Sequence, residues 1–122
     1  MLNLNSVMVG STQPSVMGEF YEKVFARPAD MVEGSEHGWK VGSTFFVVGE
    51  HSEMKGMTKD PGRVMCNFET EQVKEEFERI KATGATVIKE PYEMVGMWIA
   101  TFADPDGNYF QLMTPFDDSM GQ

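Results

Sequence analysis

Residues 97–116, MWIATFADPDGNYFQLMTPF, contain the local signal that decides the fold. Residues 98–102 mix aromatic, β-branched and small side chains, as half-buried strands do. The DPDGN segment then favours a tight turn, because Pro105 fixes φ at one corner, the aspartates can bond nearby backbone amides and Gly107 accepts a positive φ. An extended pattern resumes at residues 109–113. The stretch therefore predicts a β-hairpin, and strand alternation places Tyr109, Gln111 and Met113 on one face of it.

The rest of the chain divides into two halves with the same order of elements. In the first half, the patterns predict a strand over residues 2–9, a helix from Pro14 to about Phe25, and short strands at residues 30–33, 38–41 and 44–48. Glycines 34, 42 and 49 are expected to form turns between them. In the second half, a strand over residues 63–69, a helix capped by Thr70 and ended near Gly84, and a strand over residues 85–89 precede the hairpin. Each half is therefore predicted to be β-α-β-β-β.

Residues 50–62, EHSEMKGMTKDPG, join the two halves and are polar and glycine-containing. Such a composition is typical of a connecting loop. Thirteen residues are long for a plain connection, so a flap over a pocket is the second interpretation of this segment.

Composition and charge exclude several classes of function. A chain of 122 residues is expected to form one domain, and its net charge of −9 argues against a nucleic-acid partner, because phosphates require a basic surface. The same charge is compatible with a cationic ligand. Cys66 is the only cysteine, so no internal disulfide can form, and no apolar run approaches membrane-spanning length. A cytoplasmic protein without a membrane partner is expected.

The DPDGN hairpin at the end of two β-α-β-β-β halves resembles the vicinal oxygen chelate superfamily, which includes glyoxalase I, extradiol dioxygenases, fosfomycin-resistance enzymes and bleomycin-resistance proteins. The resemblance covers residues 2–114. It implies an α+β fold in which two βαβββ modules form a curved, partly open barrel around a cup-shaped pocket. The modules would span residues 2–49 and 63–114 of one domain, with the linker or flap at 50–62 and a tail at 115–122. It also implies a homodimer.

The same resemblance locates the positions at which metal-dependent members hold a divalent ion with histidine, glutamate or glutamine. In this sequence those positions fall on Ser6, Met65 and Gln111. A neutral hydroxyl, a thioether and an amide make a poor site for a hard or borderline divalent ion. We therefore predict that the protein has no metal cofactor. The alternative is a divalent ion held by displaced ligands drawn from the acids and histidines Glu36, His37, Glu50 and His51.

Strand parity, counted from the three ligand positions, predicts the side chains that line the pocket. They combine aromatic and thioether surface with polar groups, as small-molecule sites do, and Trp98 joins them by its place on the neighbouring strand: Ser6, Met8, Met65, Asn67, Trp98, Tyr109, Gln111 and Met113. No sequence pattern indicates a catalytic nucleophile.

Three functions fit these observations. The first is a metal-free binder of a small cationic or aromatic molecule, similar to the bleomycin-resistance branch. The second is a metal-dependent glyoxalase- or dioxygenase-type enzyme with displaced ligands. The third is a degenerate module with a filled pocket and a structural or regulatory role.

Overall fold

The computed structural model describes residues 1–51 and 53–115, and its chain forms two compact units that meet between Met57 and Thr58. This boundary falls within the segment predicted as a linker or flap. The predicted tail lies, apart from Pro115, outside the described residues. Neither described helix is long and apolar enough to cross a membrane.

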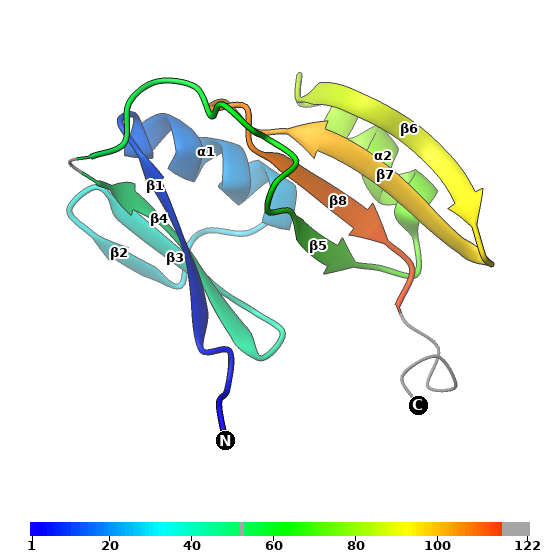
Figure 1. Ribbon diagram of the computed structural model, residues 1–122, viewed down its shortest axis with the longest axis horizontal. Helices are drawn as coiled ribbons and strands as arrows, with labels where there is room; N and C mark the ends of the chain where they lie inside the picture. The colour runs from blue at the N-terminus through cyan, green and yellow to red at the C-terminus, as the bar shows by residue number, and fades with distance from the viewer. Residues whose placement is uncertain (52, 116–122) are drawn as a thin grey trace. The chain divides into compact units, whose positions relative to one another are not determined.

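Each unit contains one helix and one four-stranded sheet (Figure 1). Unit 1 comprises β1 (Ser6–Ser11), α1 (Pro14–Phe25), β2 (Met31–Glu33), β3 (Glu36–Val41) and β4 (Thr44–Glu50). Unit 2 comprises β5 (Cys66–Glu69), α2 (Val73–Lys81), β6 (Thr86–Met94), β7 (Met97–Ala103) and β8 (Tyr109–Met113). The predicted βαβββ order is thus confirmed twice. The strand orders are β1-β4-β3-β2 and β5-β8-β7-β6, so the described strands form two separate sheets and do not close into one barrel.

An aromatic core joins α1 to one face of the first sheet. Tyr21 on α1 lies 4.8 Å from Phe46 on β4, and Phe25 lies 5.3 Å from Trp39 on β3, measured between ring centroids. Trp39 is fully buried. Strands β1 and β4 pair in parallel, with Ser6 opposite Phe45. Phe45 precedes Phe46 in the strand, so the side chains of Phe45 and Ser6 point to the face of the sheet that is turned away from α1.

The second sheet packs against α2 in the same manner. Phe77 on α2 stacks on Phe102 of β7 at 5.1 Å, and Phe102 stacks on Phe110 of β8 at 5.7 Å. Thr101 and Gln111 are cross-strand partners on the opposite face. Each sheet therefore has one face turned toward its own helix and one turned away from it.

The predicted hairpin is confirmed as β7, a tight turn and β8. The Asp104 carboxylate accepts hydrogen bonds from the backbone amides of Asp106 and Asn108 at 3.0 and 2.9 Å. Gly107 has a φ of 87°, which explains the glycine at that position. Asp104 is 4% exposed and its acceptor capacity is used inside the turn, so its role is structural.

Several predicted boundaries differ from the structure. The first strand begins at Ser6, and residues 2–5 are exposed and precede it. Gly49 does not form a turn; it pairs with Gly10 inside the sheet. A Cβ at Gly49 would lie 2.9 Å from Cγ of Glu36, so a larger residue here would have to displace the Glu36 side chain that lies across it.

In unit 2, β5 begins at Cys66 rather than at residue 63. The N-cap of α2 is Gln72, and the Thr70 hydroxyl accepts the Gln72 amide proton at 3.1 Å just before the helix. Strand β6 continues through Pro91, where the prediction ended it. This strand lies at the edge of its sheet and its register shifts on both sides of Lys89, which are the conditions under which a strand accommodates proline.

Candidate functional site

A hollow of about 340 Å³ lies on the face of the unit 1 sheet that is turned away from α1. The strand register explains how it forms. Phe45 on β4 pairs with Ser6 on β1 and with Lys40 on β3. A Cβ at Gly38 would overlap the Phe45 ring, so the bare glycine lets this ring lie flat across β3. The hollow is lined by Asn5, Ser6, Met31, Lys40, Ser43, Phe45 and Val47.

The lining combines two kinds of chemistry. Met31, Phe45 and Val47 supply apolar surface, and Phe45 and Val47 are only half-buried. The amide of Asn5, the hydroxyls of Ser6 and Ser43 and the ammonium of Lys40 supply hydrogen-bond donors. Apolar walls with a few placed polar groups are the usual composition of a small-molecule site.

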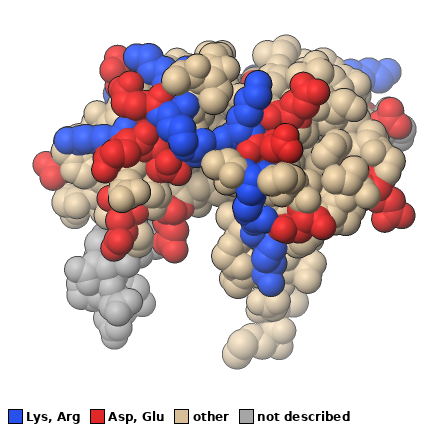
Figure 2. Space-filling view, turned by 180° about the vertical axis from the view of Figure 1, so that it is seen from behind, with Lys and Arg blue, Asp and Glu red and all other residues tan. Residues whose placement is uncertain are grey.

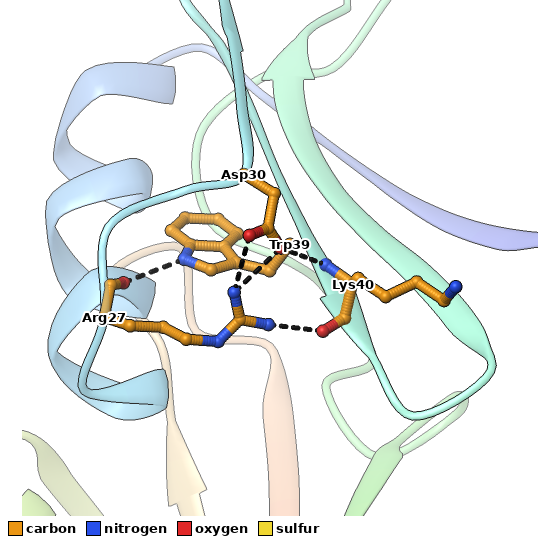
Figure 3. A network of polar contacts seen from close by, with 4 residues as sticks. All are labelled: Arg27, Asp30, Trp39 and Lys40. Carbon is orange, nitrogen blue, oxygen red and sulfur yellow. Dashed lines mark hydrogen bonds and ion pairs between the residues drawn. The ribbon is translucent and has the colours of Figure 1, made fainter.

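A cluster of polar contacts fixes β3 beside the hollow (Figure 3). Arg27 Nη1 donates to both carboxylate oxygens of Asp30 at 2.8 Å, and Arg27 Nη2 donates to the carbonyl oxygen of Lys40. The Lys40 amide donates to Asp30 Oδ2 at 2.7 Å, and Trp39 Nε1 donates to the Arg27 carbonyl at 3.0 Å. We call these four residues the clamp, because they tie the connection between α1 and β2 to strand β3.

The hydrogen bonds of the clamp do not involve the Lys40 side chain. Its contacts use only the backbone N–H and C=O of Lys40, and the side chain points away from the Arg27–Asp30 pair (Figure 3). The Arg27 guanidinium and the Lys40 amide lower the pKa of Asp30 below its ordinary value, so this carboxyl stays ionised at neutral pH. The clamp could not be predicted from the sequence, because its partners are up to 13 residues apart and no local motif links them.

Most of the predicted pocket residues lie on the sheet faces turned away from the helices. Ser6 and Met8 share that face in unit 1. Asn67 pairs with Gln111 in unit 2, and the amide of Gln111 donates to the Thr101 hydroxyl at 3.0 Å. By strand alternation Tyr109 and Met113 share the face of Gln111, and Met65 directly precedes β5.

The structure places Trp98 differently from the prediction. Trp98 and Phe102 are four residues apart on the same strand, so their side chains point to the same face, and Phe102 packs on α2. Thr101 points to the opposite face. The ammonium of Lys74, on α2, lies 3.8 Å from the centre of the Trp98 ring. Trp98 therefore belongs to the helix-covered face, and counting parity from the Phe102 position within the same strand would have shown this.

Of the four acids and histidines considered as displaced metal ligands, Glu36 and His51 lie on the same sheet face, beside the paired glycines Gly49 and Gly10, and the four do not gather as one group. Glu36 lies on the Ser6 face of unit 1, across Gly49. His37 points to the opposite face, since a Cβ at Gly18 of α1 would lie 2.8 Å from its Nδ1. His51 Nδ1 accepts the Glu53 amide proton at 3.2 Å in the loop after β4, and Glu50 ends that strand, exposed to solvent. Within residues 1–51 and 53–115, no three His, Cys, Asp or Glu side chains form a group that could hold a metal ion.

The family assignment follows from a comparison with protein-family models. The model described as "Glyoxalase-like domain" matches residues 6–113, which is nearly the whole described chain. The chain belongs to the glyoxalase-like domain family. It is thereby a member of the vicinal oxygen chelate superfamily, as the DPDGN hairpin and the repeated modules predicted. No curated protein sequence matches it.

Solved structures with similar folds support the same architecture. A glyoxalase/bleomycin resistance protein/dioxygenase family enzyme from Burkholderia phytofirmans PsJN is 23% identical, with a TM-score of 0.75 and coverage of 94% of this chain and 100% of that chain. A glyoxalase/bleomycin resistance protein from Albidiferax ferrireducens T118 is 20% identical, with a TM-score of 0.74 and coverage of 92% and 98%. Lactoylglutathione lyase from Agrobacterium tumefaciens is 16% identical, with a TM-score of 0.72 and coverage of 92% of both chains. At these identities the likeness extends to the fold alone.

At the three positions that the resemblance assigns to metal ligands, this glyoxalase-like chain carries serine, methionine and glutamine. Ser6 offers a neutral hydroxyl and Met65 a thioether, and neither suits a hard or borderline divalent ion. The Gln111 amide brings no charge and already bonds to Thr101 within its own sheet.

Proposed function

We propose that this glyoxalase-like protein binds a small, partly aromatic molecule without a metal ion, in the hollow of unit 1. The observation that carries the proposal is the hollow itself, which combines the Phe45 ring and two aliphatic side chains with neutral polar groups. Its volume of about 340 Å³ lies within the range of sites that take small ligands, roughly 300–1,000 Å³. Ser6 lines it at a position where metal-dependent relatives carry a ligand.

The rigidity of the walls supports binding. Strand β3 is fixed by the clamp, and the Phe45 ring rests against Gly38 of the same strand. A site that is already formed loses little conformational entropy when a ligand enters, so more of the contact energy appears as affinity.

The side chains around the hollow favour binding over acid–base catalysis. Among the described residues that line it, none is an aspartate, glutamate, histidine or cysteine, and the only titratable group is Lys40. General acid–base catalysis needs a group with a pKa near the working pH within hydrogen-bond reach of the substrate. The lining supplies hydrogen-bond donors and apolar contact instead.

A metal-dependent enzyme is the second candidate, and one observation favours it. Glu36 lies on the same sheet face as Ser6 and Met8, so one carboxylate is present on the face that carries a family ligand position. A bound ion there would require further ligands that the described residues of this unit do not bring together.

Metal content distinguishes the two candidates. We expect purified protein to contain no near-stoichiometric metal by elemental analysis, and its thermal midpoint to remain unchanged with Zn, Ni, Mn, Co or Fe(II), because a ligand that binds only the folded state raises the midpoint. Glu36→Gln is the matched control. Stabilisation of the wild type by one ion, together with its loss in Glu36→Gln, would support the enzyme and overturn the metal-free proposal.

A further inference from the structure

We propose that the hollow of unit 1 selects molecules that carry an acidic group, so that its ligands are aromatic or aliphatic carboxylic acids bound through Lys40. This inference rests on the proposed function, and it names the chemical class of the ligand. The negative charge expected of the ligand is opposite to the positive charge that the protein's net charge of −9 would suggest. The reason is that a bound ligand experiences the charges beside it more strongly than distant charges, which solvent and salt screen.

The local charge at the hollow is positive. Lys40 is the only charged side chain among the lining residues, and within the described chain it forms no ion pair. The neighbouring charges of Arg27 and Asp30 are paired with each other, since Arg27 Nη1 donates to both carboxylate oxygens of Asp30. Glu36 lies on the same face of β3 but four positions away, or about 13 Å along an extended strand. The Asp30 carboxylate also attracts the Lys40 ammonium but is already paired with Arg27, so among the described residues the charge of Lys40 is only partly offset.

Figure 2 shows one face of the molecule, on which Lys and Arg side chains are interspersed with Asp and Glu. On that face, positive side chains are present beside negative ones despite the net charge of −9. Electrostatic recognition depends on such local complementarity and less on net charge.

The uncharged polar groups of the lining point to the same class of ligand. Asn5, Ser6 and Ser43 each offer a hydrogen-bond donor, which a carboxylate can accept, and no described lining residue offers a carboxylate to a cation. Met31, Phe45 and Val47 provide the apolar surface for the remainder of the ligand. A molecule with an apolar body and an anionic end matches both parts of the hollow, whereas an ammonium ligand would meet the charge of Lys40.

The side chain of Lys40 can be replaced without removing a hydrogen bond of the clamp. Because the clamp uses only the backbone of this residue, Lys40→Met removes the charge while keeping the length of the side chain and the contacts of β3. Lys55→Met is the matched control, since Lys55 is an exposed lysine of the same unit that does not line the hollow. Thermal unfolding should show the same midpoint for both variants as for the wild type.

Three probes with one ring system and different charges test the proposal: 2-naphthoate, 2-naphthylmethanol and 2-naphthylmethylammonium. In NMR titrations at low salt, we expect the wild type to bind 2-naphthoate roughly tenfold more tightly than the alcohol, the scale of one charge-assisted hydrogen bond, and the ammonium most weakly. Lys40→Met should remove the preference for naphthoate and Lys55→Met should keep it.

The remaining outcomes separate the two claims. If the ammonium or the alcohol binds as tightly as naphthoate, or if Lys40→Met keeps the preference, selection for acids is wrong while binding in the hollow stands. If none of the three probes binds, the proposed function and this inference are both overturned.

Discussion

Replacing Phe102 by alanine is expected to lower the free energy of unfolding by about 3–5 kcal/mol, the range for truncating a buried aromatic side chain. Phe102 is fully buried and is the middle ring of a stack that runs from Phe77 on α2 to Phe110 on β8. Its loss would remove both ring contacts and leave a cavity between helix and sheet, which the neighbouring strands cannot fill. Urea unfolding followed by circular dichroism measures the change.

Ile88→Ala is the control for this experiment. Ile88 lies on β6 of the same sheet, and 40% of its surface is exposed, so its truncation should cost less than about 1 kcal/mol. Equal effects of the two substitutions would show that the Phe77–Phe102–Phe110 stack is not the centre of the unit 2 core.

The second large effect concerns binding. Ser6→Trp is expected to abolish binding of 2-naphthoate, because the indole would occupy the hollow that Ser6 lines. Ser6 is exposed and lies in a strand, where tryptophan is well accommodated, so the fold should be retained. The same NMR titration gives the affinity, and thermal unfolding checks the fold.

Ser35→Trp provides the matched control. Ser35 is exposed in the turn between β2 and β3 and does not line the hollow, so this variant should bind 2-naphthoate as the wild type does. Full binding by Ser6→Trp would contradict the assignment of the ligand to this hollow.

The parts of the fold that depend on local chemistry could be predicted from the sequence. The turn between β7 and β8 follows from Asp104, Pro105 and Gly107, whose conformational preferences act within a few residues. The two helices follow from apolar spacing, and the repeated order of elements then pointed to the superfamily that the family model confirms.

The errors arose where distant residues decide the local structure. Gly49 resembles a turn residue, but it lies inside β4, where the Glu36 side chain from the neighbouring strand occupies the space beside it. Pro91 resembles a strand end, but it is tolerated because β6 is an edge strand with shifts in register. Neither the position of Glu36 beside Gly49 nor the edge position of β6 can be derived from the residues nearby in the sequence.

The candidate site likewise combines features that follow from the sequence with features that depend on distant residues. Ser6 was singled out by the family resemblance, but its neighbours Lys40 and Phe45 depend on the register of three strands. The β1–β4 pair is parallel and joins residues about 40 positions apart, so only the structure brings Ser6 and Phe45 together. The net charge is compatible with a cationic ligand, whereas the position of Lys40 at the hollow is known only from the structure.

The most direct test of metal-independent binding in the hollow is a ¹H–¹⁵N correlation titration of the wild-type protein with 2-naphthoate in buffer containing EDTA. We predict that the largest shift changes occur at the amides of Ser6, Lys40, Phe45 and Val47 and that they saturate. Shift changes confined to residues outside the unit 1 hollow, or none up to the solubility limit of the probe, would contradict it.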